Sequence, residues 1–312
     1  MTLIPQPILV NGATHSAQQF RLLVEDLSRG NEGITRGTDM KVTQLGTPGG
    51  SVQVASGTGV VRGRFAAFQG TYSVANVGST TVAIAGTGGT PRSDLLILRI
   101  EDPQYEGVLD PAVDAVAYFQ VISNVSSTAT AIPDGRTGIP LARIDIPAST
   151  STITDAMIVD VRKIANPRRE RELLPPQSPT ALSALIGAST TYSYFSTAPG
   201  WNIAVPSWAS TARVRVDGSA LRLTTADFYG GFRATLGASL VLQNVTIDDN
   251  GGATTRRVQS VSADTLTIPD AYRGTTQLLR AQAAGYSGNA GRIAVDPSST
   301  LIGDIEFIEA PR

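Results

Sequence analysis

The side chains that most often perform catalysis are scarce in this sequence of 312 residues. His15 is the only histidine, and there is no cysteine. A Ser-His or Cys-His arrangement and a zinc site of ordinary composition therefore cannot be assembled. His15 precedes an expected helix start, where a capping or surface role explains it. The glycine-rich segment 86–89 lacks the lysine of a phosphate-binding loop and precedes no helix, so we expect no cofactor.

Two adjacent carboxylates, Asp248 and Asp249, are the remaining candidates for acid–base chemistry, because a glycosidase needs only two carboxyl groups. Adjacent residues on a strand point to opposite faces, which opposes a paired role. The following Asn250 and Gly251 are typical of a hairpin turn, and the Asp-x-Asp spacing of a calcium loop is missing. We therefore expect no catalytic residue and no metal site, and a glycan-cleaving enzyme is the least favoured reading.

Aromatic side chains are the other candidates for ligand contact. Trp201, Trp208, Phe228 and Tyr229 cluster in the sequence, and such rings can stack on the C–H faces of sugars. Core packing is the alternative for each ring and is favoured for Trp208, which lies at a strand-to-turn junction. Tyr229 precedes two glycines and suits the surface best. The residues predicted to contact glycan are Tyr229, Phe228 and Trp201.

The bulk composition bounds the class of protein. Hydrophobic residues make up 41% of the chain and charged residues only 16%, with 31 glycines and 18 prolines. This mixture favours short strands and turns over long helices. A net charge of −1 gives no basic excess for neutralising phosphates, so nucleic acid is not an expected partner. With no signal peptide and no apolar run of membrane-spanning length, we expect a soluble protein made in the cytosol.

Periodicity predicts the elements that would position these residues. Ser16 is a plausible N-cap for a helix whose apolar face is formed by Phe20, Leu23, Val24 and Leu27. Such a short helix must dock on a neighbouring element. The segment 91–99 reads as a strand buried on both faces. Segments 139–146 and 153–162 are its expected sheet partners.

The chain is predicted to be mainly β, in four parts. An N-terminal arm and helix occupy residues 1–34, and a β-rich module follows over 35–165. Residues 166–179 are charged and then proline-rich, which predicts a linker. Residues 180–312 contain about ten short alternating segments with turn signals at the spacing of a β-sandwich, so a jelly-roll-like sandwich is expected there.

Several weak motifs, taken in order, resemble the N-terminal module of siphophage minor tail or baseplate proteins, especially those of phages that infect actinobacteria. The family has an Arg-x-Asp-hydrophobic strand, an Ile-Pro-Leu-Ala-x-Ile strand and a final Ile-x-Asp-x-Arg strand. The resemblance covers roughly residues 35–165. It is carried by the segments Val60–Gly63, Gly70–Tyr72, Pro91–Ile100, Gly138–Ile144 and Ile153–Arg162.

The resemblance implies a virion structural protein at the distal tail, made in the host cytoplasm, and not an enzyme. Residues 35–165 would form a tail-anchoring module, often as a homotrimer, that contacts other tail-tip or baseplate proteins. The outward-facing sandwich would bind cell-wall glycan or attach a neighbouring tail protein. The alternative is a carbohydrate-binding module of a non-viral protein.

Overall fold

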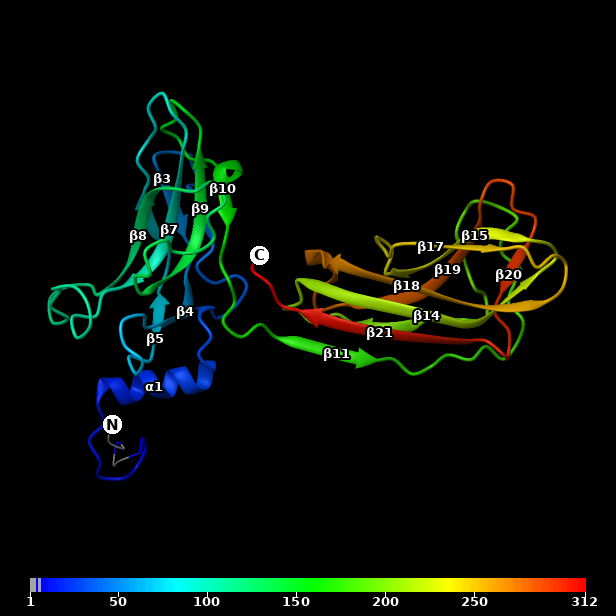
Figure 1. The fold of residues 1–312 in the computed structure, drawn as a ribbon, viewed down its shortest axis with the longest axis horizontal. Helices are drawn as coiled ribbons and strands as arrows, with labels where there is room; N and C mark the ends of the chain where they lie inside the picture. Colours follow the sequence, from blue (N-terminus) through cyan, green and yellow to red (C-terminus); the bar gives the residue numbers. More distant parts are fainter. Residues whose placement is uncertain (1–3, 5–6) are drawn as a thin grey trace. The chain divides into compact units, whose positions relative to one another are not determined.

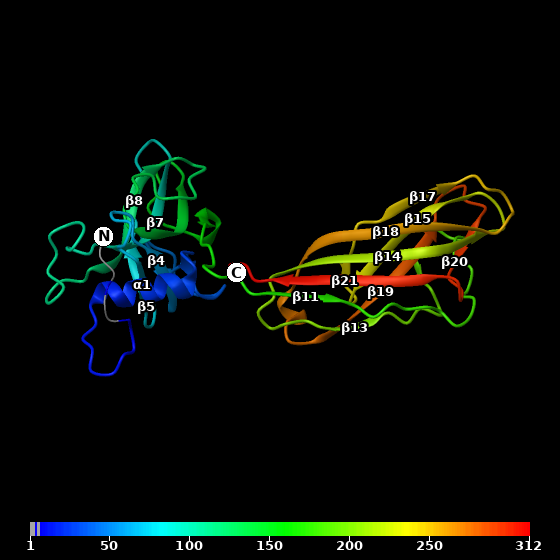
Figure 2. The ribbon, with the colours of Figure 1, turned by 60° about the horizontal axis from the view of Figure 1, so that its bottom comes forward.

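The computed structural model describes residue 4 and residues 7–312. The chain divides into two compact units. The N-terminal unit comprises Met1–Pro167 with Ala310–Arg312, and the jelly-roll unit comprises Arg168–Glu309. Both are built almost entirely of antiparallel strands (Figures 1 and 2). The prediction of a mainly β protein with one N-terminal helix is confirmed.

Three small sheets form the N-terminal unit, and their buried aliphatic side chains make one main core. The first has the order β1-β4-β5, the second β2-β3-β6 and the third β10-β9-β7-β8. Their bounds are β1 Gly33–Ile34, β2 Val42–Gln44, β3 Ser51–Val54, β4 Gly57–Arg62, β5 Thr71–Asn76, β6 Thr80–Ala83, β7 Arg92–Ile100, β8 Ala117–Val125, β9 Gly138–Ile146 and β10 Ile158–Asp160.

Strand β7 is the centre of the four-stranded sheet. Its last seven residues are all buried because β8 and β9 pair with its two edges and side chains cover both faces. The predicted doubly buried strand and its partner over 139–146 are therefore confirmed. The second predicted sheet partner, 153–162, joins the same sheet without pairing directly with β7. It forms a 3₁₀ turn, Asp155–Met157, and then the short β10, which pairs with β9 instead of β7.

Helix α1, Ala17–Ser28, begins where the sequence predicts. The Ser16 side chain accepts a hydrogen bond from the backbone N–H of Gln19, while the Gln19 side chain accepts one from the backbone N–H of Ser16. This reciprocal capping box satisfies two backbone donors that the first turn would otherwise leave free. The helix docks on β5, as a helix of this length must.

The docked face of α1 differs from the predicted one. Phe20 is 48% exposed and Leu27 is 73% exposed. The buried helix residues are polar, namely Gln19, Arg21 and Ser28. The expectation that the apolar face packs inward is therefore wrong at Phe20 and Leu27. Hydrogen bonds and the ion pair of Arg21 with Asp102 hold the helix, and Phe20 and Leu27 form an exposed apolar stripe.

Arg21 is the side chain that fastens α1 to the sheets. Its Nε donates to the carbonyl of Gln69 at 2.7 Å, and its Nη2 donates to Gln104 at 2.9 Å and to the Tyr105 hydroxyl at 3.0 Å. A carboxylate oxygen of Asp102 lies 3.4 Å from Nη1. The guanidinium also lies 5.3 Å from the ring centres of Tyr72 and Tyr105. A buried cation is tolerated here because nearly every donor has an acceptor.

The jelly-roll unit is a sandwich of two antiparallel sheets that share one core. The first sheet contains β11, β21, β14 and β18, with β20 beside β14. The second contains β13, β19, β15 and β17, with β12 and β16 as short additions. Their bounds are β11 Arg169–Leu173, β12 Ser193–Tyr194, β13 Trp201–Ala204, β14 Thr211–Thr224, β15 Phe228–Leu236, β16 Leu240–Val241, β17 Val245–Asp249, β18 Arg256–Thr267, β19 Thr276–Gly285, β20 Arg292–Ala294 and β21 Thr300–Ile308.

The strand order identifies the sandwich as a jelly roll. If the eight main strands are numbered along the chain, one sheet has the order 1-8-3-6 and the other 2-7-4-5. This is the double Greek key of jelly rolls. Successive main strands mostly alternate between sheets, and their inward residues, such as Val214, Phe228 and Phe232, fill the core. The predicted jelly-roll-like sandwich is therefore found.

The predicted linker over 166–179 is wrong in its central part. Residues 169–173 form β11, which pairs with β21 along the edge of the first sheet. Arg171 forms an ion pair with Asp304 of β21. Glu170 and Glu172 stand opposite the buried Phe307 and Ile305, so they lie on the core-facing side of the strand while remaining exposed. Charged residues indicate exposure to solvent, and this exposure is common to a linker and to an edge strand. Composition alone therefore does not distinguish the two.

The turn after Asp249 also differs from its prediction. β17 pairs with β15, whereas β18 pairs with β14 in the other sheet. The segment 250–255 is therefore a corner between the two sheets and not a hairpin turn. Turn-forming residues at that position fit either connection, so local sequence does not separate them.

Replacing Arg21 tests whether polar contacts hold α1. We expect Arg21→Ala to lower the free energy of unfolding of the N-terminal unit by about 3 kcal/mol, because Asp102 loses a buried partner. Hydrogen exchange should accelerate mainly over 17–28. The exposed Lys41→Ala is the control and should change stability by less than about 0.5 kcal/mol. Equal effects of the two substitutions would contradict the assignment.

Candidate functional site

The structure separates the three predicted glycan-contact residues. Phe228 is fully buried and Trp201 is 7% exposed, and both belong to the jelly-roll core. The Trp201 Nε1–H donates to the carbonyl of Pro175 at 2.7 Å, which satisfies its polar end inside the fold. The surface role predicted for these two residues is therefore wrong. Tyr229, at 45% exposed, lies on the outside of β15, and its contact with glycan stays a prediction.

Tyr229 has aromatic neighbours on the outer face of the second sheet. Alternation along β15 and β19 directs one set of side chains into the core and the other set outward. The outward set meets tyrosines from residues 192–194, which include β12, and from the loop after β19. We call this group the tyrosine platform. It consists of Tyr192, Tyr194, Tyr229, Tyr286, Arg233 and Arg280.

The best-defined contact of the platform is the stack of Arg233 on Tyr192. The guanidinium carbon of Arg233 lies 3.6 Å from the ring centre of Tyr192, and its Nε donates to Gln282 at 3.0 Å. Gly231 makes this arrangement possible. A Cβ atom there would lie 2.1 Å from the Tyr192 hydroxyl oxygen and 2.7 Å from that of Tyr286. The absence of a side chain at 231 lets both hydroxyls cross the strand.

A second stack lies beside the first. The guanidinium carbon of Arg280 is 4.5 Å from the ring centre of Tyr194. Arg280 is fixed by the backbone, since it donates to the carbonyls of Ala198 and Phe195 at 3.2 and 3.3 Å. The Tyr194 hydroxyl shares a hydrogen bond of 3.1 Å with Thr235. Tyr192, just before β12, and Tyr194 in β12 thus each stack with an arginine side chain.

Tyr229 and Tyr286 form the third part of the platform. Their ring centres are 5.1 Å apart in an edge-to-face arrangement, a favoured geometry for an aromatic pair. Asn244 donates to the Tyr286 hydroxyl at 2.8 Å. Asn289 accepts the backbone N–H of Tyr229 at 2.7 Å. The exposed ring of Tyr229 is therefore held on a rigid support.

The pKa values of the Tyr192 and Tyr286 hydroxyls are shifted in opposite directions. Burial raises the pKa of Tyr192 from 10.0 to about 12, and its hydrogen bond to Tyr286 adds to the rise. Burial also opposes ionisation of Tyr286. Hydrogen bonds from Thr246, Tyr192 and Asn244 and the charge of Arg233 outweigh burial, so the Tyr286 pKa is lowered. Tyr286 therefore loses its proton at lower pH than Tyr192.

This arrangement has the chemical features of a binding surface. Tyrosine faces can stack on apolar C–H groups, and fixed hydroxyl, amide and guanidinium groups can recognise hydroxyl or anionic groups. Sequence reasoning missed Tyr192, Tyr194 and both arginines. The spacing Tyr-Ser-Tyr over 192–194 puts two rings on one face of a strand, and that signal was available. The stacking of these rings with Arg233 and Arg280 joins residues far apart in the sequence, and no local signal predicts it.

The two candidate carboxylates do not form an acid–base pair. Asp248 stands opposite Tyr229, on the outer face, and Asp249 stands opposite the buried Phe228. Asp249 is held in an ion pair by Arg256 and accepts the N–H of Gly251 at 3.1 Å. The prediction that they point to opposite faces is confirmed. A calcium or glycosidase role for the pair has no geometric support.

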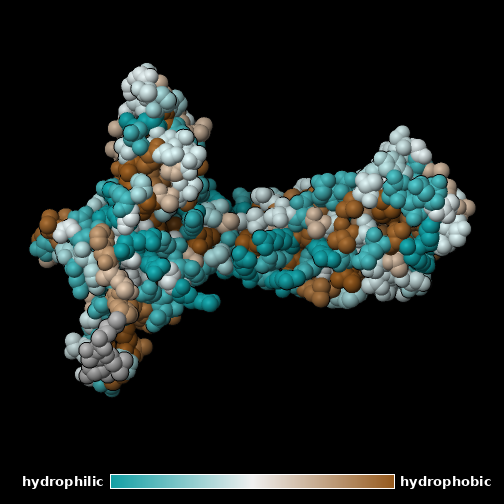
Figure 3. Space-filling model, viewed as in Figure 1, coloured by the Kyte–Doolittle hydropathy of each residue, from teal (hydrophilic) through white to brown (hydrophobic). Residues whose placement is uncertain are grey.

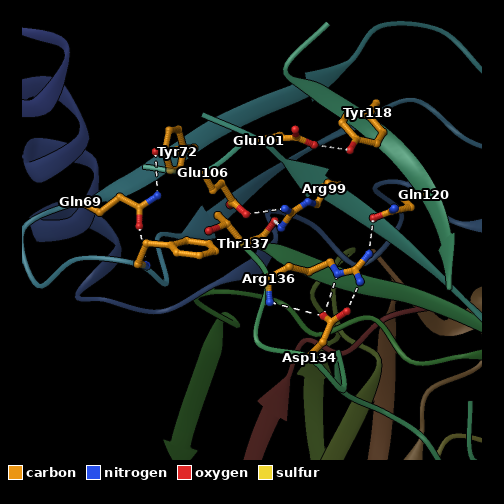
Figure 4. A network of polar contacts seen from close by, with 11 residues as sticks. Gln69, Tyr72, Arg99, Glu101, Glu106, Tyr118, Gln120, Asp134, Arg136 and Thr137 are labelled. Atoms are coloured by element: carbon orange, nitrogen blue, oxygen red, sulfur yellow. Dashed lines mark hydrogen bonds and ion pairs between the residues drawn. The ribbon is translucent and has the colours of Figure 1, made fainter. Parts of the chain in front are cut away.

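A second polar cluster lies in the N-terminal unit (Figure 4). Arg99 reaches between Glu106, with which it forms an ion pair, and the carbonyl of Thr137. Burial is the largest influence on the nearby Tyr72, and together with its hydrogen bond to Asp102 it raises the Tyr72 pKa. These groups tie the segment 101–116 to the sheets, so we assign the cluster a structural role.

Metal and membrane sites were sought among residue 4 and residues 7–312. No group of three or more His, Asp or Glu residues in that part of the chain could hold a metal ion. No helix there is long and apolar enough to cross a membrane. His15 lies edge-on to Phe20, with ring centres 6.2 Å apart, at the start of α1.

Comparison with known proteins gives only weak similarities. No protein-family model and no curated protein sequence matches the chain. The infectious bursal disease virus Gx strain structure aligns with 90% of this chain and 70% of that one, at 11% identity and a TM-score of 0.25. The insecticidal delta-endotoxin Cry8Ea1 from Bacillus thuringiensis aligns with 91% of this chain and 55% of that one, at 8% identity and a TM-score of 0.22. Scores this low carry no argument about function.

Substituting Gly231 should dismantle the platform without removing any of its side chains. We expect Gly231→Ala to displace the Tyr192 and Tyr286 hydroxyls and to lower the free energy of unfolding of the jelly-roll unit by about 1–3 kcal/mol, as overpacking does. The measurement is denaturant unfolding with tyrosine-ring NMR shifts. Gly288→Ala is a control for glycine replacement on the same unit, because its Cβ meets no atom within 4 Å, although its φ of +86° adds local strain. Unchanged ring shifts in Gly231→Ala would refute the packing described.

Alkaline titration should distinguish the two tyrosines. Tyr286 should ionise below pH 10, and Tyr192 only near pH 12. Because the folded-state pKa of Tyr192 is raised, the stability it contributes is complete below pH 10 and is lost as the pH rises towards 12. NMR titration of ring-labelled protein, with Tyr192→Phe and Tyr286→Phe to assign the signals, checks the order. Ionisation of Tyr192 before Tyr286 would contradict the opposite pKa shifts of the two hydroxyls.

Proposed function

We propose that this chain is a structural protein of a virion, located at a phage tail tip or baseplate, and not an enzyme. In this proposal the N-terminal unit anchors the protein to the distal tail. The jelly-roll unit presents the tyrosine platform for adhesion to cell-surface glycan. The observation that carries the adhesive part is the exposed Tyr229 ring, fixed at 5.1 Å from Tyr286 on a rigid outer sheet face.

The motif resemblance supports the anchoring part of the proposal. Its Arg-x-Asp motif is a structural device in this fold, since the Nε of Arg92 lies 2.7 Å from a carboxylate oxygen of the buried Asp94. The same spacing gives an ion pair between Arg143 and Asp145 at 2.9 Å. Jelly rolls also occur in viral capsid and lectin domains. These features fit a scaffold that holds surfaces in place.

The apolar stripe of α1 supports assembly of several copies. Phe20 and Leu27 are exposed on the helix, and Leu9 and Val10 are exposed on the preceding arm. Figure 3 shows hydrophobic surface around this end of the N-terminal unit. Exposed apolar groups that cluster in one place mark contact sites. We propose that the helices of a homotrimer cover one another here, with other tail-tip proteins as further partners.

Labelling of virions tests the location. Phage particles treated with an antibody against the jelly-roll unit should carry label at the distal end of the tail in electron micrographs. Label on the capsid, or on no particle at all, would overturn the proposed location. The alternative of a carbohydrate-binding module in a non-viral protein predicts no labelled particle together with retained glycan binding.

The mass of the protein in solution tests self-association. Light scattering of the purified protein at micromolar concentration should give a mass of about three chains. The double variant Phe20→Ser, Leu27→Ser should be monomeric, because each substitution removes apolar area that the contact buries. Val77→Ser is the control, since Val77 is exposed in the turn between β5 and β6. A monomeric unmodified chain would remove the homotrimer from the proposal.

A further inference from the structure

The arginines on the two outer faces of the jelly-roll unit differ in whether they form ion pairs. On the sheet that contains β14, Arg213 pairs with Glu306 and Arg215 pairs with Asp217. On the tyrosine platform, neither Arg233 nor Arg280 has a carboxylate within 4.0 Å among residue 4 and residues 7–312. One face is neutralised within the protein, and the other carries two uncompensated cations.

Arg233 has the more available guanidinium of the two. Arg280 donates from Nε and Nη2 to backbone carbonyls. Arg233 donates only from Nε, to Gln282, in the hydrogen bonds of the described residues. Its two terminal amino groups therefore keep the planar fork that matches the oxygens of a carboxylate or phosphate.

The fork of Arg233 is also held in place before a ligand arrives. Its guanidinium lies 3.6 Å from the ring centre of Tyr192, and Gln282 accepts from the Nε. A cation fixed by stacking loses little freedom on binding an anion. The exposed ring of Tyr229, on the same strand, supplies an apolar surface for the rest of the ligand. Asp248, which stands opposite Tyr229, would repel an anion at that end and confine the anionic group to Arg233.

We infer that the tyrosine platform recognises an anionic polymer, with Arg233 binding a carboxylate or phosphate group. The inference depends on the proposed adhesive function and narrows its ligand class. The shared chemistry is a planar or tetrahedral oxyanion on a repeating chain. A uronic-acid polysaccharide and a polyol phosphate polymer are the two possible sources.

Binding of three polymers to the full chain tests the inference. The probes are polygalacturonate, poly(glycerol phosphate) and the neutral glucan laminarin, measured by biolayer interferometry at fixed ionic strength. We expect at least one anionic probe to bind about tenfold or more tightly than laminarin, and the stronger of the two identifies the source. Arg233→Gln should weaken that binding at least about tenfold, as loss of a bidentate charge-assisted contact does. Arg233→Lys should restore only part of it, because lysine keeps the charge but not the fork.

Arg215→Gln is the matched control, since it removes the same charge from the outer face of the other sheet. Equal weakening by Arg233→Gln and Arg215→Gln would show non-specific attraction and overturn the inference, as would full rescue by Arg233→Lys. Circular dichroism melts confirm that each variant is folded. If laminarin bound as tightly as the anionic probes or more tightly, the inference of an anionic ligand would be overturned, and the proposed adhesive function would remain. Loss of tail label with anion binding retained would overturn only the proposed location.

Discussion

Period-two alternation along the strands is the constraint on which the jelly-roll unit depends. Each main strand must give one set of side chains to a core shared by two sheets, so the other set is forced outward. The inward set, with Phe228 and Phe232 on β15, is apolar. The outward set is therefore where the two sheets can differ. One carries paired charges, and the other carries tyrosines stacked with arginines.

The N-terminal unit meets a different constraint, which is the placement of charges in a small core. Arg92 and Asp94 stand two residues apart on β7, so their side chains leave the same face and meet there. The buried Asp94 also accepts the backbone N–H of Asn124 at 3.0 Å. Arg21 is also held by several hydrogen-bonding and charged partners, but these lie far from it in the sequence. In both cases a buried charge is tolerated through satisfied hydrogen bonds.

Much of the fold could be predicted from the sequence, because its signals were local. The N-cap at Ser16, the doubly buried β7 and the alternating sandwich strands each follow from spacing over a few residues. The docked face of α1 could not be found in this way, since periodicity shows an apolar stripe and not what covers it. Trp201 and Phe228 were assigned to the surface because ring chemistry alone does not distinguish stacking from core packing. The platform needed Tyr192 and Arg233 to meet, and only the sheet pairing brings them together.

The inward-facing glutamates of β11 have a consequence for protein solubility. A free sheet edge can accept a strand from another chain and continue the sheet, which is the first step of edge-to-edge aggregation. Glu170 and Glu172 place charge where a continued sandwich would need apolar side chains, while Arg169 and Arg171 occupy the other side. An added strand would bury uncompensated carboxylates. The charges of β11 therefore disfavour growth of the first sheet beyond this strand.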